Sequence, residues 1–267
     1  MERENAAVLR LVAGPQTGSG GPKEPKPKEA PPKLTREALF QELERGSRDE
    51  VKSGARAYVN HFKGHSPVLD LGCGRGEFLE IAQEAGLTAY GVDTDQDVVA
   101  VCRSLGLDAR QEDLFDHLAG LKEESIGGVF CSQVVEHLPP ELLPKLLADI
   151  ARVLPPGGVA VIETPNPATF ATHVHSFWRD PTHIRPVPEA ALGFSARTAG
   201  LVVESVVYTS PVPDEERLQA IEVRTSDHDL RATVEGINRM TTRLNELLYG
   251  YQDYALIAVK PEPAESE

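Results

Sequence analysis

The amino-acid sequence predicts an α/β fold, with a doubly wound, seven-stranded, mostly parallel sheet covered by helices on both faces. Two observations lead to this prediction. Apolar runs typical of buried strands alternate with stretches of helical periodicity from about residue 65 to residue 260, which is the pattern of a parallel sheet. The first run, Val68–Leu71, passes directly into a glycine turn, Gly72–Gly76, and such strand-to-helix turns form ligand sites in open α/β sheets.

Each element of the sheet is predicted from an apolar run or an apolar periodicity. The predicted strands are residues 68–71, 88–92, 108–111, 128–132, 159–163, 201–208 and 254–259. Helices are predicted from the glycine turn to about residue 85, around residues 98–102 and from about residue 141 to residue 154. A later amphipathic helix is marked by apolar residues at helical spacing, namely Val234, Ile237, Met240, Leu244 and Leu248.

The segments outside the sheet have different compositions. Residues 1–33 are rich in Gly, Pro, Lys and Glu, and residues 261–267 are mainly Pro, Glu and Ser. We expect both to be disordered tails, because they cannot bury enough apolar surface to fold. Residues 34–64 are expected to form two lid helices, the second of which begins with the capping pattern Ser47–Glu50. The main domain is then residues 65–260.

The charge balance and the cysteines restrict the partners and the compartment. Lys plus Arg number 27 and Asp plus Glu 41, so the formal charge is 27 − 41 = −14, which disfavours nucleic acid as a partner. The three cysteines, Cys73, Cys102 and Cys131, form no C-x-x-C pair. This indicates a reducing compartment and no disulfide framework. No apolar run has the length of a membrane span, so we expect a cytoplasmic protein.

The glycine turn favours a positively charged cofactor over a dinucleotide. Gly72, Gly74 and Gly76 have the spacing G-x-G-x-G, and Glu77 stands where the third glycine of the dinucleotide fingerprint would lie. A carboxylate at that position is a poor neighbour for a pyrophosphate. Asp70, just before the turn, suits a ligand that carries ammonium and sulfonium groups. S-adenosylmethionine is such a ligand.

Two further acids follow the second and third predicted strands. Asp93 ends the run Tyr90–Asp93, where a carboxylate can accept hydrogen bonds from the two ribose hydroxyls. Asp113 and Leu114 follow the third strand, and the carboxylate or the neighbouring amide could meet the adenine edge.

These pieces occur in a fixed order along the chain, as D-x-G-x-G-x-G, G-V-D, E-D-L, V-V-E-H-L and P-P-G-G. The set resembles the class I S-adenosylmethionine-dependent methyltransferases over roughly Leu34 to Lys260. The resemblance implies a Rossmann-like fold, leading helices that form a lid, and an antiparallel pairing of the last two strands. It also implies that S-adenosylmethionine is bound by Asp70, Gly72, Cys73, Gly74, Gly76, Asp93, Thr94, Asp113, Leu114, Ser132 and Gln133.

The segment after the fourth strand is the predicted place of the chemistry, with Glu136 and His137 as the catalytic residues. Methyl transfer from a sulfonium mainly requires alignment of donor and acceptor, and a base is needed only when the acceptor atom carries a proton to be removed. His137 is the candidate base because an imidazole titrates near neutral pH. The alternative is a histidine that only orients the loop through hydrogen bonds.

A bound metal is another possibility at this segment. Ubiquinone-pathway O-methyltransferases and small-RNA 2′-O-methyltransferases, which resemble this chain here, carry E-x-x-E-H and bind a divalent metal through it. In this chain Gln133 replaces the first glutamate, and a neutral amide is a weak ligand, so no metal is expected. His173, His175 and His183 follow at spacings that match no standard metal pattern.

The proline-rich loop after the fifth strand is the predicted acceptor site. A loop of this length, residues 163–188, is more often functional than idle. Its cations, Arg179, His183 and Arg185, could hold an anionic group, and Trp178 could pack on a sugar or an aromatic face. The predicted acceptor-binding residues are Arg48, Trp178, His183 and Arg185. The alternative is a proline-braced loop whose polar residues only bond locally.

Further motifs narrow the resemblance to methyltransferase domains of bacterial O-antigen and polysaccharide biosynthesis. They are R-G-S-R, E-T-P-N-P, D-P-T-H-x-R-P-x-P and D-Y-A-L-I-A. The implied reaction is O-methylation of a sugar, a sugar phosphate or another small-molecule or glycan-precursor acceptor. Two other functions stay open, a non-catalytic S-adenosylmethionine-binding partner of a glycosyltransferase or scaffold and a nicotinamide-dependent oxidoreductase, which Glu77 disfavours. The oligomeric state is not predicted.

Overall fold

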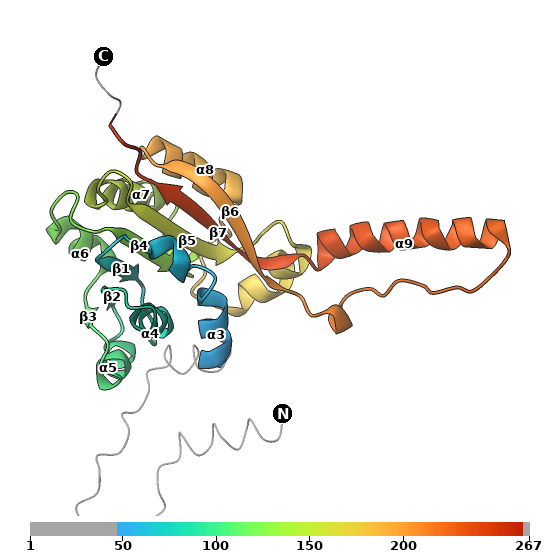
Figure 1. Cartoon of the computed structure of the whole chain (residues 1–267), viewed down its shortest axis with the longest axis horizontal. Helices are drawn as coiled ribbons and strands as arrows, with labels where there is room; N and C mark the ends of the chain where they lie inside the picture. The colour runs from blue at the N-terminus through green and yellow to red at the C-terminus, as the bar shows by residue number, and fades with distance from the viewer. Residues whose placement is uncertain (1–46, 264–267) are drawn as a thin grey trace, which may run out of the picture. The chain divides into compact units, whose positions relative to one another are not determined.

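The structure is a computed structural model that describes residues 47–263, without the side chain of His175. In this range seven strands form one sheet in the order β3-β2-β1-β4-β5-β7-β6 (Figure 1). The strands are β1 (Val68–Leu71), β2 (Ala89–Asp93), β3 (Ala109–Gln111), β4 (Gly128–Ser132), β5 (Val159–Pro165), β6 (Val202–Pro211) and β7 (Tyr251–Val259). The first five are parallel, and β7 runs antiparallel to both β5 and β6. The predicted doubly wound fold is confirmed.

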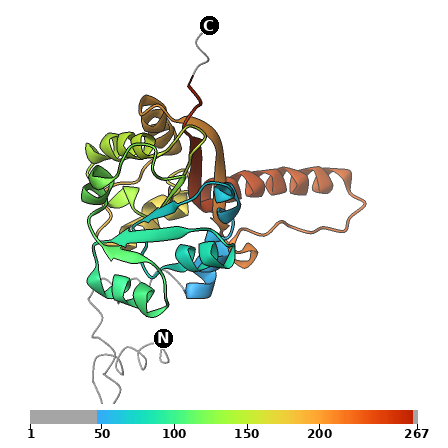
Figure 2. The same ribbon diagram turned by 60° about the vertical axis from the view of Figure 1, so that its left-hand side comes forward.

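Helices connect the strands and cover both faces of the sheet (Figures 1 and 2). The longer ones are α3 (Arg48–Ala55), α4 (Glu77–Glu84), α5 (Gln96–Ser104), α6 (Leu114–Gly120), α7 (Leu142–Val153), α8 (Glu189–Thr198) and α9 (His228–Leu248). The short helical turns are η1 (Val59–Phe62), η2 (Val135–His137), η3 (Thr172–Ser176), η4 (Phe177–Arg179) and η5 (Asp214–Glu216).

Each face of the sheet has its own apolar core. Residues of α6, α7 and α8 pack on one face, where Leu146, Leu147 and Ile150 of α7 are fully buried. On the other face the rings of Phe78 and Phe130 stack at 4.0 Å between centroids, together with residues of α3 and η1. Burial on both faces explains why the parallel strands are nearly continuous apolar runs.

The structure differs from the sequence prediction in three places. Helices α6 and α8 lie in segments where no helix was predicted. The loop after β5 contains helical turns, η3 and η4, because residues 168–180 hold no proline that would prevent them. The second lid helix ends at Ala55 and a turn leads to η1. The first lid helix and the N-terminal tail were predicted for segments that lie outside the described residues, as does most of the predicted C-terminal tail.

Helix α9 lies apart from the sheet (Figure 1). Asp227 caps its first turn by accepting from the amides of Asp229 and Leu230. The segment before the helix, residues 218–227, has no regular structure and lies along it. Asn238 bonds the backbone amide and carbonyl of Ile221, and Asn245 bonds those of Leu218. Within the described part of the chain, no helix is both long enough and apolar enough to span a membrane.

Candidate active site

The glycine turn after β1 has a backbone shape that side chains would disrupt. Gly72, Gly74 and Gly76 have φ angles of 73°, 50° and 82°, which lie in the left-handed region that favours glycine. The amides of Gly72 and Cys73 both donate to the carbonyl of Val92, at 2.9 and 3.0 Å. A Cβ on Gly72 would lie 2.5 Å from Val134 Cγ2. The turn is therefore held against the ends of both β2 and β4.

A Gly72→Ala substitution is expected to destabilise the protein by about 1–3 kcal/mol, because it adds strain at a positive φ and a clash with Val134. It should also abolish measurable binding of S-adenosylmethionine at this turn. The matched control is Gly54→Ala in α3, where a Cβ meets nothing within 4 Å and alanine favours a helix. Thermal unfolding and calorimetry with the cofactor measure both effects. A Gly72→Ala protein that binds as tightly as wild type would show that the turn is not the cofactor site.

Asp93, at the end of β2, connects the glycine turn to the next helix. Its Oδ2 accepts from the Gly74 amide at 3.0 Å and its Oδ1 from the Asp95 amide at 2.9 Å. Asp95 in turn caps α5 through its own carboxylate. Each oxygen of an ionised carboxylate has a second lone pair, so Asp93 can still accept from the hydroxyls of a ribose.

The adenine side of the predicted cofactor site is built around α6. The Asp113 carboxylate caps this helix by accepting from the Phe115 and Asp116 amides. Beside it, His117 Nδ1 lies 2.6 Å from Glu112 Oε2, and its Nε2 lies 3.1 Å from the Tyr90 hydroxyl. Tyr90, Glu112 and His117 thus connect β2, the turn after β3 and α6. Sequence reasoning did not identify His117, because a lone histidine inside an unpredicted helix gives no signal.

Asp70 is the predicted partner of the cofactor's cationic groups. It lies in β1 and is only 3% exposed. Burial raises the pKa of Asp70 well above its usual value, and Cys102, Asp93 and Glu77 raise it further. A cation bound nearby would oppose both effects by favouring the charged form.

We therefore expect the affinity for S-adenosylmethionine to increase with pH until the pH passes the raised pKa of Asp70 in the free protein. Below the raised pKa of Asp70 the carboxyl is protonated, and binding a cation must release that proton. Affinity then rises by up to about tenfold per pH unit until the carboxyl is ionised in the free protein. Calorimetry across this range measures the slope, and Asp70→Asn should remove it. An unchanged slope in the variant would show that another group titrates.

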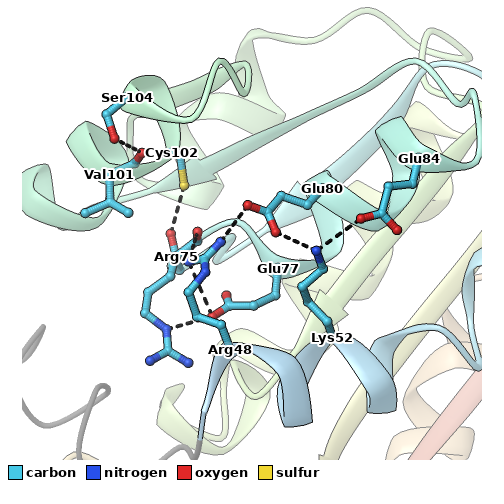
Figure 3. Close-up of polar contacts among 10 residues, drawn as sticks. Arg48, Lys52, Arg75, Glu77, Glu80, Glu84, Val101, Cys102 and Ser104 are labelled. Carbon is cyan, nitrogen blue, oxygen red and sulfur yellow. Dashed lines mark hydrogen bonds and ion pairs between the residues drawn. The ribbon is translucent and has the colours of Figure 1, made fainter.

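The first described helix, α3, is attached to the glycine turn and to α4 by ion pairs (Figure 3). Arg48 donates to the Arg75 carbonyl at 2.8 Å and to Glu80 at 2.9 Å, while Lys52 pairs with Glu80 and Glu84. The Arg48 guanidinium therefore lies on the glycine turn and on α4. The structure does not bring it to the loop that carries His183, so its predicted acceptor role stays a prediction.

Two other residues predicted to bind the cofactor have side chains engaged or directed elsewhere. The Cys73 side chain is buried in a small apolar cluster with Leu79, Val99 and Cys102, so only its backbone lines the turn. Cys102 Sγ donates to the Gly74 carbonyl at 3.2 Å and so connects α5 to the glycine turn (Figure 3). Thr94 is exposed directly after β2.

Ser132, the last residue of β4, and Gln133 after it contact two carboxylates that sequence reasoning did not assign to the site. Ser132 Oγ donates to Glu163 Oε2 at 2.5 Å, and Gln133 Nε2 donates to Asp253 Oδ1 at 3.1 Å. Tyr58, which follows α3, donates to Glu163 Oε1 at 2.6 Å. Burial raises the pKa of Asp253 to about 6, with a further contribution from Glu163. The only sequence signals for these two acids were their positions in E-T-P-N-P and D-Y-A-L-I-A.

Glu136 and His137, the predicted catalytic pair, lie in η2 next to His183. The Glu136 side chain is fully buried, and its Oε2 accepts from Thr164 Oγ1 at 2.8 Å. The His137 and His183 rings are 4.6 Å apart between centroids. His183 Nε2 lies 4.0 Å from Glu136 Oε1. The long loop after β5 therefore returns to the end of β4, as its predicted acceptor role requires.

The hydrogen bonds of the two histidines define which nitrogen carries the proton. Thr182 Oγ1 donates to Asp180 at 2.6 Å and so accepts from His137 Nδ1–H at 2.9 Å. His183 Nδ1 donates to the Phe177 carbonyl at 2.6 Å. In a neutral imidazole with the proton on Nδ1, the basic lone pair is on Nε2. Both rings therefore have a basic Nε2.

Asp180 is the negative end of this hydrogen-bond chain. Burial acts to raise its pKa, but hydrogen bonds from Thr182 and the neighbouring His183 and His137 lower the pKa overall. Asp180 is therefore ionised at neutral pH and orients His137 through Thr182. This arrangement resembles the way an aspartate orients a catalytic histidine in hydrolase triads.

Glu136, His137 and His183 could also hold a metal ion. Among the described residues, Glu136, His137 and His183 each offer one ligand atom, and these atoms lie within 4.8 Å of one another. Two imidazoles and a carboxylate are a donor set that suits divalent transition metals. Gln133 is not part of this group, because its amide is bonded to Asp253.

The remaining predicted acceptor residues differ in exposure. The Trp178 ring is 54% exposed and packs at a right angle on Phe177, which is buried. Arg185 follows His183 by two residues and is half-buried. The backbone amides of Ile184 and Arg185 both donate to the Glu136 carbonyl, at 2.9 and 3.4 Å. Both Trp178 and Arg185 therefore belong to the same loop cluster as His137 and His183.

Comparisons with known proteins agree with this arrangement. A family model described as a methyltransferase domain matches residues 31–206. A solved SAM-dependent methyltransferase from Archaeoglobus fulgidus is 35% identical, with a TM-score of 0.79 over 85% of this chain and 100% of that chain. A probable S-adenosylmethionine-dependent methyltransferase from Mycolicibacterium smegmatis is 32% identical over 142 residues, which are 52% of this chain and 53% of the relative.

A third relative is a ubiquinone biosynthesis O-methyltransferase from Xanthomonas campestris. It is 33% identical over 115 residues, which are 40% of this chain and 47% of the relative. The chain spans about half the length of the curated relatives it matches.

Proposed function

This chain belongs to the methyltransferase-domain family and its cofactor is S-adenosylmethionine, and on that premise we propose that it methylates a hydroxyl oxygen of a small acceptor. The acceptor class we propose is a sugar, a sugar phosphate or a related glycan precursor. The O-antigen and polysaccharide motifs in the sequence support this class, and the ubiquinone O-methyltransferase relative supports oxygen as the acceptor atom.

The observation that carries the proposal is the chain of hydrogen bonds from Asp180 through Thr182 to His137. It presents a basic Nε2 beside the end of β4, where the methyl donor is expected. A hydroxyl is a weak nucleophile, and a general base that takes its proton contributes typically 10²–10⁴-fold. His137 Nε2 is the proposed base, and the Glu136 carboxylate beside it favours the imidazolium that forms.

The cofactor supplies the activated methyl group, so the protein's other task is alignment. We propose that Asp70 and the glycine turn hold the methionine part, Asp93 the ribose, and Leu114 with Asp113 the adenine. Ser132 and Gln133 lie at the end of β4, directly before the turn η2 that carries Glu136 and His137. Their hydrogen bonds to Glu163 and Asp253 keep the end of β4 in place.

A metal is not required by this mechanism, although Glu136, His137 and His183 fit one by number and type of donor. If an ion were bound there, these three residues would hold it and it would polarise the acceptor oxygen. The proposal with His137 as base predicts that prolonged dialysis against EDTA leaves the rate unchanged. A loss of activity that Mn²⁺ or Zn²⁺ restores would replace the base with a metal.

The experiment that tests the function is a screen of acceptors for release of S-adenosylhomocysteine. The panel contains neutral sugars, sugar phosphates and phenols, each with the wild-type protein and with His137→Gln. We expect turnover with a sugar or a sugar phosphate that the variant lacks. Turnover only with phenols would overturn the proposed acceptor class. Tight cofactor binding without turnover on any acceptor would support the non-catalytic alternative.

A further inference from the structure

Arg185 has an unusual environment for an arginine. No hydrogen bond or ion pair of its guanidinium occurs within residues 47–263, and its Nε is buried without a partner. Leaving a buried donor unsatisfied costs about 1–3 kcal/mol, and more for a charged group. By contrast, Arg48 and Arg75 at the glycine turn pair with glutamates of α4.

The backbone on both sides of Arg185 is held in place. Its own amide and that of Ile184 donate to the Glu136 carbonyl. The Val187 carbonyl accepts from the buried Tyr254 hydroxyl at 2.8 Å. Pro186 keeps Arg185 away from helical conformations. The guanidinium is therefore presented from a fixed position, which limits the entropy lost when it binds a ligand.

The carboxylates of Asp180 and Glu136, and that of Glu189 four residues after Arg185, which accepts from the Tyr208 hydroxyl, bond other groups. Asp180 accepts from Thr182, and Glu136 accepts from Thr164. His137 and His183 add imidazoles that become positively charged when they take up a proton. The cluster thus offers a positively charged guanidinium that pairs with no carboxylate of the described part of the chain.

From these contacts we infer that Arg185 binds an oxyanion of the acceptor, a phosphate or a carboxylate, next to the hydroxyl that is methylated. A guanidinium can donate two parallel hydrogen bonds to either group. The backbone amide of Arg185 donates to the carbonyl of Glu136, the residue before His137. An anion bound to Arg185 would therefore lie close to His137. The inference rests on the proposed function, and it restricts the acceptor to anionic small molecules.

The chain has a single tryptophan, Trp178, in the same loop, so its fluorescence reports on this site. The experiment titrates the protein, saturated with S-adenosylhomocysteine, with methyl phosphate, acetate and neutral methyl glucoside at constant ionic strength. Wild type should show a saturable change with methyl phosphate or acetate and none with the glucoside. The anion that binds more tightly identifies whether the acceptor group is a phosphate or a carboxylate.

Arg185→Gln should weaken anion binding at least tenfold, and Arg185→Lys should fall between this variant and wild type because a lysine cannot donate the paired hydrogen bonds. Arg197→Gln, which alters an exposed arginine of α8, is the control and should bind like wild type. Unfolding curves of all variants exclude a general loss of structure. Equal anion affinity in Arg185→Gln, or no saturable binding by wild type, would overturn the inference.

The outcome is distinguishable from a failure of the proposed function. If Arg185→Gln loses anion binding but wild type turns over no acceptor, the anion site stands and the methyl-transfer proposal fails. Turnover on neutral sugars that Arg185→Gln retains would keep the methyltransferase function and remove the anionic acceptor.

Discussion

Replacement of Asp93 by asparagine is expected to weaken S-adenosylmethionine binding by about 100-fold, because hydrogen bonds to a charged acceptor contribute about 1.5–3 kcal/mol each. Asparagine keeps the size of the side chain and one acceptor oxygen. It loses the charge, and its NH₂ group can accept neither from the Gly74 amide nor from a ribose hydroxyl. The glycine turn and the cofactor would therefore lose the same partner.

Calorimetry with S-adenosylmethionine and S-adenosylhomocysteine measures this loss for both ligands. Asp149→Asn is the control, since Asp149 lies on α7 and pairs with Lys145 at the surface, where an ion pair contributes little. Because Asp93 also supports the turn, unfolding curves should accompany the titrations. A folded Asp93→Asn protein with wild-type affinity would remove Asp93 from the cofactor site.

Replacement of His137 by glutamine is expected to lower kcat by about 10²–10⁴-fold, the usual contribution of a general base. The affinity for S-adenosylmethionine should stay within about twofold of wild type, because His137 bonds to Thr182 in the loop after β5, whereas the cofactor is expected at the glycine turn. The rate of wild type should also fall as pH decreases through the pKa of the base, since a protonated imidazole cannot accept the hydroxyl proton.

The matched control is His228→Gln, whose side chain is 94% exposed at the start of α9. Rates and cofactor affinities of both variants, measured from pH 5.5 to 8.5, separate a base from a structural histidine. A His137→Gln protein with a reduced rate but an unchanged pH profile would indicate that His137 only orients the loop. Thr182→Val tests the hydrogen bonds from Asp180 through Thr182 to His137. We expect it to lower kcat while cofactor binding is retained.

Much of the backbone around the predicted cofactor site was predictable because its requirements are local. The left-handed φ angles of Gly72, Gly74 and Gly76 can be inferred from the residue type alone, since other side chains rarely adopt them. Asp93 and Asp113 follow strands, and the ends of parallel strands meet at one edge of a sheet. The helix caps made by Asp95 and Asp113 are likewise properties of a few consecutive residues.

The assignments that involved long-range partners were less predictable. Nothing in the sequence indicated that Arg48 pairs with Glu80, 32 residues away, and its predicted acceptor role stays a prediction. Glu163 and Asp253 are brought together by the antiparallel pairing of β5 with β7, in which Pro165 faces Asp253. A one-residue change in that register would turn these carboxylates to opposite faces. Hydrophobic periodicity alone could not specify it.

The sequence by itself therefore determined the seven strands in their order along the chain, the glycine turn, and the acids in β1, at the end of β2 and after β3. These features depend on backbone conformation and on apolar periodicity over a few residues. Only the tertiary structure decided which side chains face one another. It brought Asp180, Thr182 and His183 of the loop after β5 to Glu136 and His137 after β4, where the backbone amides of Ile184 and Arg185 bond the Glu136 carbonyl. Such contacts depend on how separate segments pack, which no short stretch of sequence specifies.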